Sequence, residues 1–169
     1  MDDLIYNQTQ IPKEQWRYGL RSSSAVGCGW IAVYNAMCLM GFRVVPEKLI
    51  RYFEKQLPLI HGNAGTSILG PAVCMKQMGF RTKVTADRAE FDELAKSADV
   101  CILFYRWTKP WKYGAHFVAL EYRDGRFIGY NTYTNSVGPD DYGYSLKGFL
   151  EKKKYFGPVL TAIWKGPHE

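Results

Sequence analysis

The sequence predicts a single domain of the α+β class, helical in its first half and built on a mostly antiparallel β-sheet in its second half. The chain has 169 residues and contains no internal repeat, low-complexity segment or linker, which is typical of one domain. Hydrophobic residues make up 47% of it and aromatic residues 15%, enough to form a buried core. Segments with helical patterns come first and β-branched, aromatic segments follow, which is the order expected of an α+β fold.

The first 98 residues divide into an N-terminal arm and a mainly helical part. Residues 1–27 are rich in turn formers, so we expect an irregular arm there. A helix is expected from Cys28 to Met40, because this stretch is apolar on nearly every side and Gly41 follows as a natural C-terminal residue. Such a helix is usually buried all round. The other predictions for this part are helices over 46–57, 67–78 and 90–98 and a short strand over 81–85.

Residues 99–169 are expected to be mainly β. Strong β-formers mark strands over 100–107, 116–122, 126–133 and 159–164. Between the last two strands we expect a loop rich in Gly, Pro and Asp, followed by a short helix near 145–153. The pair Asp124-Gly125 is a strong signal for a two-residue hairpin turn that joins the second and third strands.

Charge and hydropathy exclude several classes of function. The net charge is +6, and the positive residues are scattered apart from Lys147 and the run 152–154, which a solvated helix face explains. No nucleic-acid-binding motif accompanies them, so we expect no nucleic-acid partner. No apolar run is long enough to span a bilayer, and the start MDDLIYNQTQ lacks the cationic region of a signal peptide. We therefore expect a cytoplasmic protein with no membrane partner; a processed secreted protein is the alternative, and oligomeric state stays open.

One of the four cysteines has an unusual setting. Cys38, Cys74 and Cys101 sit inside apolar patterns, as buried cysteines commonly do, and the chain has no C-x-x-C pair. Cys28 instead stands between two glycines at the start of the predicted buried helix. A helix N-terminus stabilises a thiolate and lowers the pKa of a cysteine, which favours a nucleophile. The alternative is an ordinary structural cysteine at a helix entry.

A nucleophilic thiol needs a base, and the base needs a group that orients it. Of the three histidines, His168 is next to the C-terminus and His61 lies in a predicted loop, whereas His116 opens a strand. If Asp124-Gly125 is the turn, paired positions sum to 249, and His116 shares one face of the hairpin with Asn131. The two are then diagonal neighbours, roughly 7 Å apart. An unrelated half-buried histidine and strand asparagine are the alternative.

A cysteine at a helix start, a histidine on a strand and an asparagine on the next strand resemble the papain-like cysteine peptidases. The closest resemblance is to the bacterial branch that includes the double-glycine leader peptidases. It rests on Gly27-Cys28-Gly29, on GAHFV at 114–118 and on GYN at 129–131, and it covers nearly the whole chain. It implies a papain-like fold in which Cys28 attacks an acyl carbon, His116 transfers the proton and Asn131 holds the imidazole. The backbone N–H of Cys28 would serve the oxyanion hole.

This sequence departs from the papain-like pattern at two positions. Many relatives carry a glutamine six residues before the cysteine as an oxyanion donor, and Ser22 stands there instead. Tyr6-Asn7-Gln8 resembles the Y-x-Q segment of relatives with a longer arm, so Gln8 is our candidate for that donor. Trp30 stands where relatives commonly have proline, and it either walls a substrate cleft or belongs to the core.

Aromatic residues crowd the segment just before His116. Trp107, Trp111 and Tyr113 are candidates for a substrate wall or a lid beside the site. The alternative is hydrophobic cover for the end of the sheet. Interleaved Lys and Arg also suit acidic or sugar-containing ligands.

Two hypotheses of different class follow. The first is a cysteine hydrolase that cleaves a peptide or amide bond in a peptide or protein substrate; the same residues also suit acyl transfer to an amine. The second is a catalytically weak domain that binds peptides or leader sequences. A metal site from Cys28 and His116 lacks the third ligand that even catalytic zinc needs, so we expect neither a metal nor a cofactor.

Overall fold

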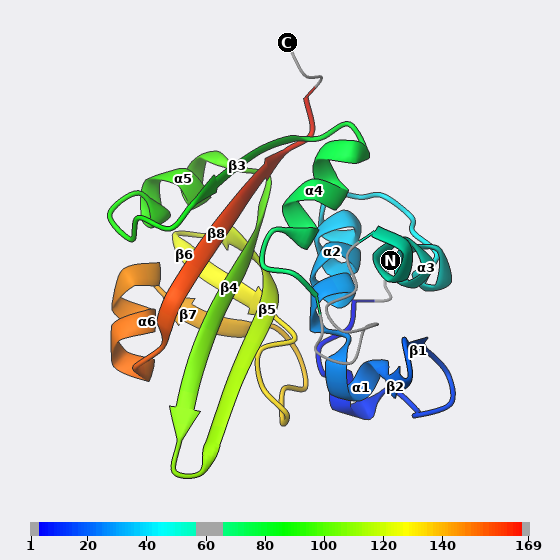
Figure 1. Ribbon diagram of the computed structural model, residues 1–169. Helices are drawn as coiled ribbons and strands as arrows, with labels where there is room; N and C mark the ends of the chain where they lie inside the picture. The colour runs from blue at the N-terminus through cyan, green and yellow to red at the C-terminus, as the bar shows by residue number, and fades with distance from the viewer. Residues whose placement is uncertain (1–3, 57–65, 167–169) are drawn as a thin grey trace.

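The computed structural model describes residues 4–56 and 66–166 and confirms the α+β class. Within these residues, six strands form one sheet in the order β3-β8-β4-β5-β6-β7, and every neighbouring pair is antiparallel. Figure 1 shows α2, α3 and α4 to one side of this sheet and α5 and α6 to the other. The strands are β3 (Arg81–Thr85), β4 (Val100–Lys109), β5 (Lys112–Arg123), β6 (Arg126–Tyr130), β7 (Asp140–Gly143) and β8 (Phe156–Trp164).

The helices follow the predicted order with small shifts at their ends. They are α2 (Cys28–Leu39), α3 (Pro46–Gln56), α4 (Gly70–Gln77), α5 (Phe91–Ser97) and α6 (Leu146–Lys153). Helix α2 is buried on all sides from Gly29 to Met37, as its apolar sequence predicts. Helix α4 begins at Gly70 rather than Ser67, because Pro71 is favoured in the first turn of a helix. Leu57, placed in the second helix by the sequence pattern, lies outside the described residues.

The two faces of the sheet support two hydrophobic clusters. Side chains alternate along a strand, so Phe104 and Phe117 face the cluster that contains α2, while Leu103 and Val118 face the cluster that contains α5 and α6. Strand β5 therefore lies between the buried helix that begins with Cys28 and the second cluster. This arrangement brings the start of α2 to the strand that carries His116.

The arm is more ordered than predicted. Residues 4–27 contain η1 (Gln8–Gln10), β1 (Arg17–Tyr18), β2 (Arg21–Ser22) and α1 (Ser23–Val26). Each of these elements has four residues or fewer and so lacks the length that a sequence pattern needs, which is why the turn-forming composition suggested an irregular segment. Helix α1 runs almost directly into α2, with Gly27 as the junction. A Cβ atom at Gly27 would lie 2.6 Å from the carbonyl oxygen of Ser23, so the junction requires glycine.

The hairpin between β5 and β6 has the predicted register. Asp124 and Gly125 have φ values of 53° and 78°, the left-handed conformation that a type I′ turn needs at both central positions. The ladder runs from Arg123 opposite Arg126 to Tyr130 opposite Ala119. It ends there, because Asn131 has φ 64° and leaves the extended conformation. Strand β6 is therefore shorter than the predicted strand 126–133, and β7 occupies part of the predicted loop.

The hairpin between β4 and β5 is longer than predicted. Residues 108–115, which separate the predicted strands 100–107 and 116–122, continue both strands and turn at Pro110 and Trp111. In Figure 1 this hairpin projects beyond the rest of the sheet. Trp111 has φ 64° at the turn, and its side chain is fully exposed.

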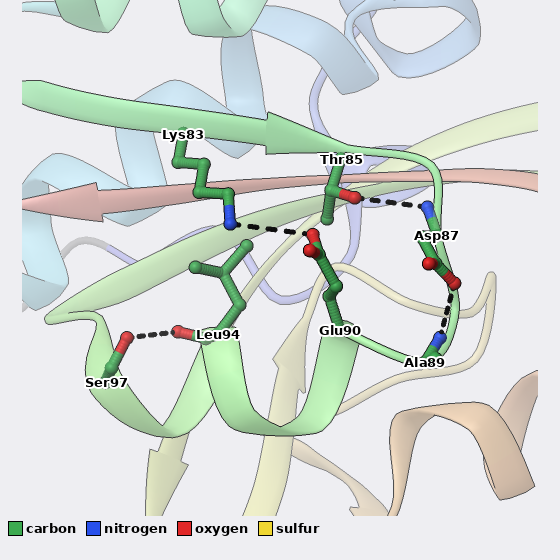
Figure 2. Close-up of polar contacts among 7 residues, drawn as sticks. All are labelled: Lys83, Thr85, Asp87, Ala89, Glu90, Leu94 and Ser97. Carbon is green, nitrogen blue, oxygen red and sulfur yellow. Dashed lines mark hydrogen bonds and ion pairs between the residues drawn. The ribbon is translucent and has the colours of Figure 1, made fainter.

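The connection from β3 to α5 is held by local polar contacts (Figure 2). The backbone N–H of Asp87 donates to Thr85 Oγ1 (3.1 Å), and the N–H of Ala89 donates to Asp87 Oδ1 (2.9 Å). Lys83 on β3 forms an ion pair with Glu90 at 3.5 Å. The short predicted helix after this turn is thus anchored to the edge strand of the sheet, on the far side from Cys28.

None of the helices within 4–56 and 66–166 combines the length and the apolarity needed to cross a bilayer.

Candidate active site

Cys28 is the first residue of α2 and is half-buried. Helix α1 precedes it, so Cys28 does not follow an irregular arm as the sequence suggested; the N–H of Gly27 is bonded to the Ser23 carbonyl, and the first bond of α2 joins the N–H of Ile31 to the Gly27 carbonyl. The N–H groups of Cys28 and Gly29 nevertheless lie against the Cys28 sulfur, as does the backbone of Phe117 on β5. The thiol is therefore held at the contact between α2 and the strand that carries His116.

The pKa of the Cys28 thiol differs from the sequence-based expectation. Burial raises the pKa, and the backbone groups of Phe117, Gly29 and Cys28 itself lower it by a smaller amount. The net direction is upward, whereas a helix N-terminus alone predicts a lowered pKa. At neutral pH the isolated thiol is protonated, so its reactivity depends on a base.

His116 is half-buried on β5, where its ring nitrogen Nε2 lies 2.6 Å from the backbone carbonyl oxygen of Asn131. A carbonyl only accepts hydrogen bonds, so Nε2 carries the proton and donates it. The neutral ring is thereby fixed in one tautomer, with Nδ1 as its basic nitrogen. Burial lowers the pKa of His116, and the Asn131 carbonyl opposes this effect. His116 is consequently a neutral base at pH 7.

The predicted pairing of His116 with Asn131 occurs, but through a different group. The sequence argument used the asparagine side chain on an extended strand, whereas the contact is made by the Asn131 backbone carbonyl. The left-handed φ of Asn131 turns its side chain away from the predicted face. That side chain is buried and is bonded to Gln8 instead. Asparagine adopts this conformation more readily than most residues.

Gln8 and Asn131 form a closed pair of hydrogen bonds. The backbone N–H of Gln8 donates to Asn131 Oδ1 (2.8 Å), and Asn131 Nδ2 donates to Gln8 Oε1 (3.0 Å). Gln8 Nε2 donates to the carbonyl of Ser24 in α1 (3.2 Å). The candidate oxyanion donor is thus attached both to the residue that holds His116 and to the helical turn that precedes Cys28.

Two asparagines that sequence reasoning did not single out hold the arm in place. Asn35, fully buried in α2, accepts from the N–H of Ile5 (2.9 Å) and donates to its carbonyl (2.8 Å). Asn7, also buried, donates to the carbonyl of Thr134 (2.7 Å). The only sequence signal for Asn35 is an amide in an otherwise apolar helix, since a buried polar side chain requires a partner.

Of the aromatic residues predicted to line the site, one lies in the core and three lie on the β4–β5 hairpin. Trp30 is fully buried and packs edge-on against Trp16 at 5.6 Å, which agrees with the core alternative rather than the cleft wall. Trp107 is half-buried on the β4–β5 hairpin, and Trp111 and Tyr113 are exposed there. Tyr105 connects this hairpin to the site, because its ring meets that of His116 edge-on at 6.0 Å.

Cys28 belongs neither to a metal-binding cluster of the described residues nor to the lining of the cavity beside the arm. Within the described ranges, no group of three or more His, Cys, Asp or Glu residues could hold a metal ion. His61 and His168 lie outside those ranges. A shallow cavity of about 280 Å³ lies between the arm and the loop after β6, with Ile5, Tyr6 and Val137 among its lining residues.

Comparison with known proteins gives a likeness of fold. No protein-family model matches the chain, and no curated protein matches it. Among solved structures, the chain is similar to the peptidase domain of Streptococcus ComA, a bi-functional ABC transporter involved in a quorum-sensing pathway. The TM-score is 0.52 and the sequence identity 16%, over 80% of this chain and 90% of that domain. The likeness therefore extends over most of both chains and concerns the fold.

Proposed function

We propose that this protein is a cysteine hydrolase of the papain-like type, which cleaves a peptide or amide bond in a peptide or protein substrate. The observation that carries the proposal is the orientation of His116. Its Nε2–H is committed to the Asn131 carbonyl, which leaves Nδ1 as the base, and the Cys28 thiol lies against the backbone of the very next residue, Phe117. The fold likeness to a peptidase domain supports the same class.

The reaction starts from a neutral pair. Burial keeps the thiol protonated and the imidazole neutral, so proton transfer accompanies attack rather than preceding it. Cys28 Sγ bonds to the acyl carbon while its proton passes to His116 Nδ1. The C–N bond then breaks and the leaving amine takes that proton. Water hydrolyses the thioester, gives a proton to Nδ1, and the proton returns to the departing sulfur.

The oxyanion is stabilised by groups at the start of α2 and on the arm. The N–H groups of Cys28 and Gly29 already lie against the sulfur, where negative charge develops nearby. Gln8 Nε2 has two hydrogens, and one of them is bonded to Ser24. Gln8 supplies the second hydrogen as the side-chain donor. Removing one such donor typically lowers the rate by about 100-fold or more.

The proposal is tested with a pool of internally quenched fluorogenic peptides. We expect turnover by the wild-type protein, a loss of at least about a thousandfold in Cys28→Ala, and a comparable loss in His116→Ala, because neither group acts without the other. Iodoacetamide should inactivate the wild type in step with labelling of Cys28. Full activity of Cys28→Ala would exclude the mechanism.

A catalytically weak peptide-binding domain is the second candidate. Two observations favour it: Ser22 replaces the glutamine of many relatives, and burial raises the pKa of Cys28. Peptide binding that is equally tight in the wild type and in Cys28→Ala, without turnover by either, would favour this candidate over the hydrolase.

A further inference from the structure

The β4–β5 hairpin carries a continuous stripe of aromatic and basic side chains on the sheet face that bears His116. Residues opposite one another on this face are Tyr105 with His116, Trp107 with Gly114, and Lys109 with Lys112. The indole of Trp107 occupies the space above Gly114, since a Cβ atom there would be 2.1 Å from the ring. We call Trp107, Lys109 and Lys112 the hairpin stripe.

The two lysines of the hairpin stripe converge on one indole. The Nζ atoms of Lys109 and Lys112 lie 5.6 Å and 5.8 Å from the ring centroid of Trp107, one from each strand. Like charges directly opposite in a sheet are destabilising. Both side chains are exposed, and neither has an acidic partner among the described residues. Within residues 4–56 and 66–166, no carboxylate therefore neutralises the two ammonium groups.

The charge around the hairpin is of one sign. From Val100 to Leu120 the sequence contains Arg106, Lys109 and Lys112 and no Asp or Glu. The first acid after this stretch, Glu121, already pairs with Arg123 at 3.1 Å. The hairpin is thus a positive projection that begins at the proposed base and extends into solvent (Figure 1).

A second basic–aromatic pair joins α6 to the segment after β6. Lys153, at the end of α6, places Nζ 4.9 Å from the ring centroid of Tyr133. Burial chiefly raises the pKa of Tyr105, and the phenol of Tyr133 adds to this effect. The pair therefore adds a basic group near the segment that follows Asn131.

We propose that the hairpin stripe binds acidic side chains of the peptide substrate and presents its acyl group to Cys28 and His116. The inference deepens the proposed function and rests on it. Carboxylates would relieve the repulsion between Lys109 and Lys112, and Trp107 supplies an apolar floor for the neighbouring methylene groups. The direct continuity of the stripe with His116 favours a substrate over a membrane surface as the occupant.

Binding is measured first, in the Cys28→Ala protein, so that turnover is not required. The probes are two fluorescein-labelled peptides of equal length, one alternating Glu with Leu and one alternating Lys with Leu. We expect the acidic peptide to bind about tenfold more tightly, and the difference to shrink as salt is raised. Equal binding of both peptides would overturn the proposal.

Charge reversal locates the binding. Lys109→Glu/Lys112→Glu should abolish the preference for the acidic peptide, whereas Lys48→Glu/Lys76→Glu, which alters the net charge equally on exposed positions of α3 and α4, should retain it. An equal loss in both variants would attribute binding to overall charge and overturn the proposal. The proposal would also be overturned if the protein bound phosphatidylserine vesicles, only the hairpin variant lost this binding, and neither peptide bound more tightly than the other.

Failure of the inference differs from failure of the proposed function. Turnover of fluorogenic peptides without preference for acidic members would overturn only the inference. Selective binding of the acidic peptide by Cys28→Ala, with no turnover by the wild type, would support the stripe and overturn the hydrolase.

Discussion

At the scale of single residues, the backbone angle of Asn131 decides which of its groups meets His116. In the left-handed conformation its carbonyl accepts from Nε2 and its side chain reaches Gln8. One residue therefore performs two tasks, orienting the base through its backbone and holding the arm through its amide. Asn131→Gly tests this division, because glycine retains the backbone carbonyl that accepts from His116 but has no side-chain amide to bond Gln8.

Asn131→Gly should lower kcat/KM by about ten- to a hundredfold, since Gln8 loses its anchor while the carbonyl on His116 remains. The acid limb of the pH–rate profile should stay where the wild type has it. Asn131→Ala should show the same rate loss and also a stability about 1 kcal/mol lower, because alanine disfavours a positive φ. A loss in Asn131→Gly as large as that in His116→Ala would mean that the side chain, not the carbonyl, orients the base.

The reactivity of Cys28 toward iodoacetamide should depend steeply on pH. Because burial raises the pKa of the thiol, the thiolate fraction at pH 7 is small, and the rate should rise through a midpoint above the ordinary value of about 8.5. Peptide mass spectrometry at a series of pH values measures it. Cys74, whose pKa burial raises to about 12, should remain unlabelled in the folded protein and serves as the internal control. A Cys28 midpoint well below 8.5 would indicate a preformed thiolate–imidazolium pair.

At the scale of elements, the sequence predicts structure well where local chemistry is decisive. Asp124-Gly125 determines the hairpin register, and the uniformly apolar stretch after Cys28 predicts a helix buried on all sides. Neither pattern reveals how a strand ends. The turn of the chain at Asn131 depends on contacts with Gln8, 123 positions away, and no local signal encodes such a partner. The upward pKa shift of Cys28 likewise comes from burial by the whole fold rather than from its helix.

The start of α2 depends on the absence of a side chain at Gly29. A Cβ atom there would lie 2.2 Å from Thr66 Oγ1, and Thr66 is itself buried. Gly29→Ala should therefore lower the free energy of unfolding by about 1–3 kcal/mol, through overpacking. Gly148→Ala in α6 is the matched control, because its Cβ would meet nothing closer than 3.6 Å. Urea denaturation of both variants measures the difference, which equal stabilities would contradict.

At the scale of the whole molecule, the arm ties the helical part to the sheet. Ile5 is bonded to Asn35 in α2, while Asn7 and Gln8 are bonded to Thr134 and Asn131 after β6. The arm thus joins the two parts of the chain that carry the proposed nucleophile and base. A substitution that weakens the attachment of the arm to α2 should therefore also weaken its attachment to the segment after β6.

Asn35→Ala should lower stability by about 1–3 kcal/mol, because it leaves the N–H and the carbonyl of Ile5 without their partner. It should also lower turnover, although both hydrogen bonds of the Asn35 amide are made to Ile5 rather than to the proposed catalytic residues. Hydrogen exchange of the amides in residues 4–11 should become faster. Asn135→Ala, at an exposed position, is the control and should leave all three measurements unchanged. Unchanged turnover in Asn35→Ala would separate the arm from catalysis.

The bonds between Gln8 and Asn131 also set an order of events during synthesis of the protein. The ribosome makes the arm and Cys28 before it adds His116 and Asn131. An unfinished chain therefore has the thiol without an oriented imidazole and without an anchored Gln8. The proposed activity therefore cannot arise before residue 131 has been translated.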